Sequence, residues 1–148
     1  MNGKRNEEMG DKIKLLVVDD EQQFLEALCK RLEFRDFEIT SVNNGAEAIE
    51  AARKERFDVA LIDLKMPGIE GEELFSLLKE EDPFLEVIIL TGHGSIDSAI
   101  RSTKQGVFSY LHKPCPLDTL LHVLMEAHQR RVKKINEYNE KNIKGTTS

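Results

Sequence analysis

The sequence predicts an α/β fold, a doubly wound (βα)5 arrangement with a five-stranded parallel sheet. Two observations carry this prediction. Short apolar runs alternate five times with segments whose apolar residues recur at helical spacing. Several of these runs are apolar at nearly every position, which is typical of parallel strands covered by helices on both faces. The length of 148 residues fits about one domain with its own core.

The first half of the chain supplies three expected strands. They run over residues 13–18, 37–42 and 57–62. Apolar residues at helical spacing follow the first strand over 24–32 and the second over 46–52, which predicts a helix in each place. Asn44 precedes the second of these helices and is a favourable N-cap.

The second half continues the alternation. Pro67-Gly68 breaks the chain after the third strand, and a helix with Leu74, Leu77 and Leu78 ends at Asp82-Pro83. The fourth and fifth strands are expected over 87–90 and 107–111, with a helix from Ser95 to Gln105 between them. A leucine stripe over 117–124 marks a last helix.

Charge divides the chain into three parts. Residues 1–12 carry no net charge and are expected to be a flexible N-terminal segment. Residues 13–128 carry a net charge of −10, and residues 129–148 carry +4. We therefore expect a folded acidic domain over 13–128 followed by a basic polar tail. The favoured interpretation of the tail is a partly disordered extension, and the alternative is that it prolongs the last helix.

Composition excludes several classes of protein. No apolar run approaches the roughly 18 residues of a membrane span, and no apolar segment follows the first charges as in a secretory signal. Cys29 and Cys115 have no metal-binding spacing and are expected to be reduced thiols. The overall charge of −6 argues against a nucleic-acid surface. A cytoplasmic protein without membrane contact is expected.

Polar side chains gather where the expected strands end. Asp19 and Asp20 follow the first strand, Asp63 the third, Thr91 the fourth and Lys113 the fifth. Right-handed crossovers place these ends on one edge of the sheet, where α/β proteins bind ligands. Clustered carboxylates repel one another unless a cation joins them, and oxygen ligands suit Mg²⁺. A lysine beside them can stabilise phosphoryl oxygens, and a carboxylate can become an aspartyl phosphate.

These residues resemble the receiver domains of bacterial two-component response regulators. The resemblance rests on Asp19-Asp20, on Asp-Leu-Lys-Met-Pro-Gly at 63–68, on Thr91-Gly92 and on Tyr-Leu-His-Lys-Pro at 110–114. It covers roughly residues 13–128. It implies a chemotaxis-regulator-like fold with the flavodoxin-like strand order 2-1-3-4-5. It also implies a phosphorylation-controlled signalling switch that catalyses only its own phosphorylation and dephosphorylation and is otherwise not an enzyme.

The resemblance assigns a role to each residue of the site. Asp63 would accept a phosphoryl group from a histidine kinase or a phosphotransfer protein. Asp20 would bind Mg²⁺ directly and Asp19 through water, with the backbone carbonyl of Lys65 and with Asp63 itself completing the protein ligands. Mn²⁺ is expected to substitute for Mg²⁺. The Thr91 hydroxyl would bond the phosphoryl group.

Lys113 would pair with a phosphoryl oxygen, and the peptide bond to Pro114 is expected to be cis, as in the family. Thr91 and Tyr110 would form the switch that reports phosphorylation. The polar helix over Ser95–Gln105, the fifth strand and the last helix would then form the face for an output protein or domain, and a homodimer is also expected from the family.

Two positions depart from the commonest receivers. Lys65 lies two residues after Asp63, and His93 lies two residues after Thr91. In the family, residues at these positions influence the lifetime of the phosphoryl group, so both are expected modulators. The stretch Thr-Gly-His-Gly at 91–94 resembles receivers of sigma-54-dependent activators.

Three other functions compete with a working receiver. An aspartyl-phosphate phosphatase of the haloacid dehalogenase type would need a second aspartate where Lys65 stands. A flavodoxin-like electron carrier would need a phosphate-binding loop after the first strand, where 19–21 is acidic instead. The third alternative is a degenerate receiver that acts as a phosphorylation-independent scaffold.

Overall fold

The computed structural model describes residues 12–33, 35–63, 71–92 and 106–147. The parallel sheet has the order β2-β1-β3-β4-β5, as the resemblance implied. Its strands are β1 (Ile13–Val18), β2 (Phe37–Val42), β3 (Val59–Ile62), β4 (Glu86–Thr91) and β5 (Val107–His112). The helices are α2 (Gln22–Leu32), α3 (Gly45–Lys54), α4 (Gly71–Glu81) and α6 (Leu117–Thr147).

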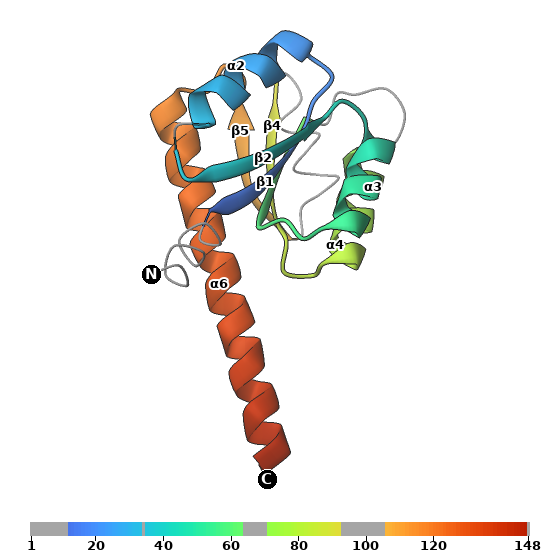
Figure 1. Ribbon diagram of the computed structural model, residues 1–148, viewed down its shortest axis with the longest axis vertical. Coiled ribbons are helices and arrows are strands. Elements are labelled where there is room, and N and C mark those ends of the chain that lie inside the picture. The colour runs from blue at the N-terminus through green and yellow to red at the C-terminus, as the bar shows by residue number, and fades with distance from the viewer. Residues whose placement is uncertain (1–11, 34, 64–70, 93–105, 148) are drawn as a thin grey trace, which may run out of the picture.

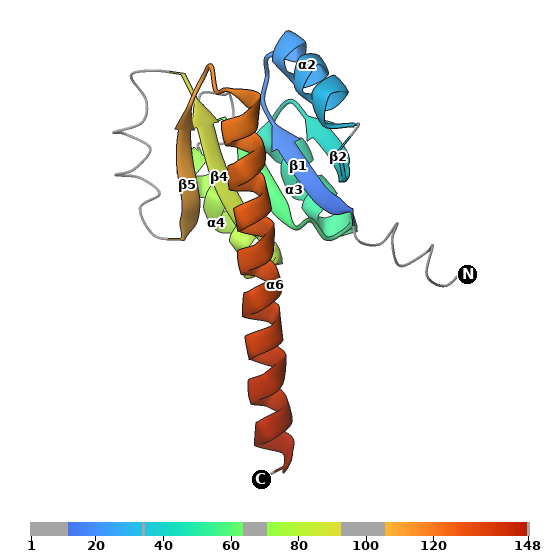
Figure 2. The same ribbon diagram turned by 90° about the vertical axis from the view of Figure 1, so that its left-hand side faces the viewer.

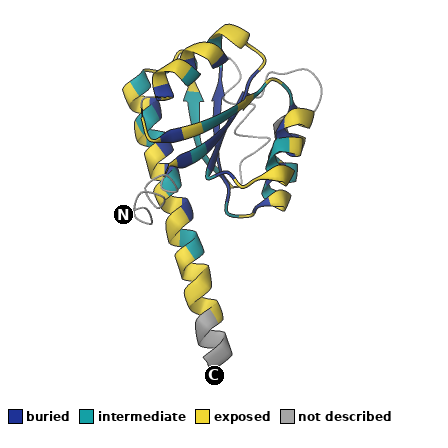
Figure 3. Cartoon of the chain, viewed as in Figure 1, coloured by how far each residue is buried: buried dark blue, intermediate teal, exposed yellow. Residues whose placement is uncertain are grey.

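The helices cover the sheet on both faces, and the strand sequences show why (Figures 1 and 2). Neighbouring residues of a strand point to opposite faces, so strands buried on both sides need apolar residues throughout. In β1, Leu15 and Val17 pack with α2 and α6 on one face, whereas Leu16 and Val18 pack with α3 and α4 on the other. Figure 3 shows the buried strands between helices whose outer surfaces are exposed.

Most expected elements are confirmed, with small differences at their ends. Asn44 caps α3, since its side chain accepts the amide hydrogen of Glu47 at 2.9 Å. The third strand begins at Val59 rather than at residue 57, because the Asp58 carboxylate turns back to accept the Lys14 amide hydrogen at 2.8 Å. The expected helix over 95–105 lies outside the described residues.

The C-terminal segment differs from the favoured interpretation. Instead of a partly disordered tail, residues 129–147 continue α6, which forms one helix from Leu117 to Thr147. The apolar stripe of the helix, Leu120, Leu124 and Ala127, is followed at the same spacing by the buried Arg131. In the described part of the chain, no helix is both long and apolar enough to cross a membrane.

Candidate functional site at the carboxyl edge of the sheet

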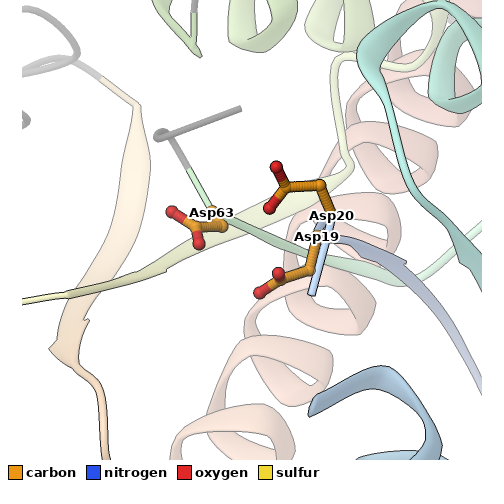
Figure 4. A group of neighbouring side chains, drawn as sticks. All are labelled: Asp19, Asp20 and Asp63. Carbon is orange, nitrogen blue, oxygen red and sulfur yellow. The ribbon is translucent and has the colours of Figure 1, made fainter. Parts of the chain in front are cut away.

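Three aspartates converge where β1 and β3 end side by side (Figure 4). The Asp63 amide donates to the Val18 carbonyl at 2.9 Å, which carries the pairing of β1 and β3 one residue past the strands. Asp19 and Asp63 are buried, and Asp20 is exposed. One carboxylate oxygen from each aspartate lies within 4.8 Å of the others. The fold therefore brings together the three carboxylates that the sequence placed at strand ends.

Lys113 neutralises part of this negative charge. Its Nζ atom lies 2.5 Å from Asp19 Oδ2, 2.6 Å from Glu21 Oε1 and 3.0 Å from Asp63 Oδ2. The ammonium also lies over the Phe24 ring, 4.3 Å from its centroid. The Lys113–Pro114 peptide bond is cis, as expected. Lys113 thus links β5 to the acidic ends of β1 and β3.

The protonation equilibria follow from burial and from these contacts. Burial lowers the pKa of Lys113, but hydrogen bonds to Asp19, Glu21 and Asp63 outweigh burial and raise the pKa above its usual value. Burial raises the pKa of Asp19, and the hydrogen bond from Lys113 offsets part of that rise. The site therefore holds a firmly protonated lysine beside a carboxylate whose charged form is disfavoured by burial.

Thr91 contacts the opposite side of Asp63. Its buried hydroxyl donates to Asp63 Oδ1 at 2.9 Å, while Lys113 donates to Oδ2. The Thr91 carbonyl accepts the Lys113 amide hydrogen at 2.9 Å, so the pairing of β4 with β5 positions both side chains. Asp63 is consequently contacted at each of its two oxygens by a different donor.

The remaining expected residues have a less definite place. Tyr110 lies on β5 beside Ile89 and packs, half-buried, against the core on the α3 and α4 face. That position is compatible with a switch role, which stays a prediction. Lys65, His93 and the 95–105 helix lie outside the described residues.

The structure adds two residues to the site. Glu21 binds the Lys113 ammonium, and its own amide donates to Asp19 Oδ1 at 2.9 Å. Phe24 lies under the same ammonium. Glu21 could have been found as the third acid in the run that follows β1. Phe24 gave no signal beyond its place in the helical apolar stripe.

The donor set suits a hard divalent cation. All three aspartates offer oxygen ligands, and the exposure of Asp20 leaves one side open to water. Among the described residues, Asp19, Glu21 and Asp63 contact the single Lys113 ammonium, and Asp20 adds a fourth carboxylate beside two of them. Negative charge thus exceeds positive charge, which favours an added cation.

Known proteins share this fold and sequence. Residues 15–125 match the family model described as the response regulator receiver domain. The chain is 36% identical over 123 residues to the transcriptional regulatory protein GlrR of Escherichia coli strain K12. That alignment covers 83% of this chain but only 28% of GlrR.

Solved structures agree with this match. A response regulator receiver domain protein of Clostridium thermocellum has a TM-score of 0.74 and 34% identity, covering 83% of this chain and 98% of that one. A response regulator of Burkholderia pseudomallei was solved with a phosphorylated aspartic acid, a calcium ion and citrate. It has a TM-score of 0.70 and 29% identity, and the match covers 84% of this chain and 74% of the Burkholderia chain. The chain therefore belongs to the receiver domain family of response regulators, whose members are phosphorylation-controlled regulators.

Proposed function

We propose that this receiver is phosphorylated on Asp63 by a histidine kinase or a phosphotransfer protein in a Mg²⁺-dependent reaction. One observation carries the choice of Asp63 over its neighbours. Among the three clustered aspartates, Asp63 receives both a hydroxyl hydrogen bond from Thr91 and an ammonium hydrogen bond from Lys113. These two donors lie where charge would develop on a transferred phosphoryl group.

The group transfer is balanced by simple bond exchange. An Asp63 oxygen attacks the phosphorus of the donor, a P–O bond forms, and the bond from phosphorus to the donor's histidine nitrogen breaks. Lys113 and Thr91 then donate to oxygens of the phosphoryl group instead of to the free carboxylate. Hydrolysis of the acyl phosphate by water restores Asp63 and releases inorganic phosphate. Beyond this turnover of its own modification, we propose no enzymatic activity.

Asp19, Asp20 and Asp63 would hold the metal ion, and the Lys65 carbonyl is the proposed fourth protein ligand. Bound Mg²⁺, or Mn²⁺ in its place, would neutralise phosphoryl oxygens at the acidic edge of the sheet. Asp19 is held for this role by the Glu21 amide at Oδ1 and by Lys113 at Oδ2. The Burkholderia relative, solved with a phosphorylated aspartic acid and a calcium ion, supports the same pairing of modification and cation here.

The signalling role extends this proposal. Thr91 would follow the phosphoryl group and Tyr110 would change its packing, which would alter the face formed by residues 95–105, β5 and α6. An output protein or domain, or a second copy of the chain, would recognise that face in the cytoplasm. Lys65 and His93 would set the lifetime of the phosphoryl group.

Intact-protein mass after incubation with acetyl phosphate tests the proposal. We expect one Mg²⁺-dependent phosphoryl adduct on the wild type, none on Asp63→Asn, and an unchanged adduct on the matched control Asp36→Asn, which lies exposed before β2. If neither acetyl phosphate nor a panel of histidine kinases modifies the wild type, the chain is a degenerate receiver that acts as a scaffold.

A further inference from the structure

A second group of charges lies at the opposite edge of the sheet, where the strands begin, and its buried members are Asp82, Glu86 and Arg131. We call it the basal ion cluster. Its carboxylates are Asp58 before β3, Asp82 after α4 and Glu86 at the start of β4. Its cations on α6 are Arg130, Arg131 and Lys134. Part of the basic charge of residues 129–148 therefore forms ion pairs with acids of the receiver body.

Arg131 is the centre of the basal ion cluster. It follows Ala127 in the buried stripe of α6 and is only 6% exposed. Its Nη1 atom donates to Asp82 Oδ2 at 2.9 Å, and its Nε atom lies 3.2 Å from Asp58 Oδ1. The same Asp82 accepts the Phe84 amide hydrogen at 2.9 Å, and Asp58 accepts that of Lys14. Backbone amides thus hold both carboxylates in place independently of Arg131.

Glu86 provides a second attachment. Its residue is 1% exposed, and Lys134 Nζ and Arg130 Nε lie 3.2 and 3.7 Å from its Oε2 atom. That oxygen has no hydrogen-bond partner of good geometry among the described residues, so charge attraction is what compensates its burial. A carboxylate this deeply buried is costly without nearby cations, and α6 supplies them.

The helix continues beyond these contacts. One turn after Lys134, the Tyr138 ring meets the Phe84 ring edge to face, with centroids 5.5 Å apart. Past that point α6 runs on to Thr147, clear of the sheet (Figures 1 and 2). The basal ion cluster therefore lies at the place where the helix leaves the body.

We propose that the basal ion cluster is a rotational lock, which holds the projecting part of α6 at one orientation to the receiver body. Each helical residue advances by about 100°, since a turn has 3.6 residues. Arg130, Arg131 and Lys134 consequently meet their acids in one rotation of the helix only. Apolar contacts are non-directional and would tolerate small rotations, whereas charge pairs with fixed acids specify a register. A segment or partner attached beyond the lock is presented at a constant angle.

Residual dipolar couplings and backbone relaxation of the whole chain test this lock. In the wild type, couplings of residues 132–140 should fit the same alignment tensor as the sheet, with order parameters of about 0.85. In the double variant Arg131→Met, Glu86→Gln, they should no longer fit that tensor, and order parameters of 134–140 should fall below about 0.6. The matched control Lys133→Met removes an exposed cation of the same helix that has no described ion pair.

The outcomes separate clearly. A wild-type segment that does not share the tensor of the sheet overturns the proposal, and so does a double variant that still shares it. If the double variant does not fold, the single variant Glu86→Gln is measured instead, because glutamine keeps the shape of the side chain and removes its charge. An unchanged orientation of residues 132–140 in that variant also overturns the proposed lock. Phosphorylation of Asp63 should be unchanged in every variant, since the two edges are remote.

Discussion

The two edges of the sheet both bury charge, but they balance it differently. At the carboxyl edge, the described residues form a group of four carboxylates and one lysine, and the lysine contacts three of the four. At the opposite edge, four arginine and lysine side chains of the described residues lie within 4 Å of the three acids of the basal ion cluster, counting Arg56 at 3.3 Å from Asp82. Burial of charge is therefore common to both edges, and neutralisation is what distinguishes them.

This difference in charge balance indicates which cluster carries out chemistry and which cluster supports the structure. An excess of buried negative charge can be relieved by an added cation, and Mg²⁺ there would also offset the further negative charge that an acyl phosphate on Asp63 brings. A neutralised cluster gains no stability from a further ion. Removing one partner of its buried ion pairs leaves an unpaired charge in the interior. We expect chemistry at the carboxyl edge and structural support at the basal edge.

The largest effect on stability is expected at the basal edge. Arg131→Met leaves Asp82 and Asp58 without their buried partner, and breaking a buried pair on one side costs about 3 kcal/mol or more. Urea unfolding measures this loss, and the acetyl phosphate adduct on Asp63 should persist. A change below about 0.5 kcal/mol would show that the cluster is as weak as a surface pair.

A smaller loss, this time of function, is expected at the carboxyl edge. Lys113→Met removes the ammonium at 3.0 Å from Asp63 and should slow phosphorylation by acetyl phosphate at least about tenfold. Lys133→Met serves as the control, because it removes an exposed lysine far from the site. A Lys113→Met rate within about twofold of wild type would contradict the role of this lysine.

Magnesium should distinguish the edges by its effect on stability. At ten times its dissociation constant, Mg²⁺ should raise the free energy of unfolding of the wild type by about 1.4 kcal/mol, since it binds the folded site only. Asp20→Asn, which removes the exposed carboxylate of the site, should abolish most of this gain. Glu86→Gln should keep the gain in stability from Mg²⁺. Loss of that gain in Glu86→Gln would indicate that the cation binds at the basal edge instead.

The smallest effect sharpens the comparison within the basal edge itself. Arg53 and Glu81 form an ion pair of 3.1 Å, but the Arg53 side chain is 61% exposed. Glu81→Gln should change the free energy of unfolding by less than about 0.5 kcal/mol, because water already screens the pair. Equal losses in Glu81→Gln and Arg131→Met would mean that burial does not decide the strength of these pairs.

Much of the carboxyl edge could be predicted because its residues follow strands directly. Asp19, Asp63 and Thr91 need only the position of each strand end, and right-handed crossovers bring those ends together. Glu21 and Phe24 were not predicted as site residues, because their contacts with Lys113 depend on how the start of α2 approaches β5. No local pattern specifies that approach, since it joins segments about ninety residues apart.

The tail shows the opposite case. Residues 129–148 have a polar, basic composition that favours disorder on its own. Their helix is supported instead by Asp58, Asp82 and Glu86, which lie far away in sequence. Helices in proteins draw most of their stability from tertiary packing rather than from propensity, so composition alone gave the wrong weight to the two alternatives.

The sequence by itself determined the alternation of strands and helices, the edge on which the carboxylates meet, and the resemblance to a receiver. These features depend on local periodicity and on general rules of chain crossover. Only the tertiary structure decided which donor reaches each oxygen of Asp63, which acids meet the basic tail, and where α6 points. Those are pairings between distant side chains, and they exist only once packing has fixed the distances between them.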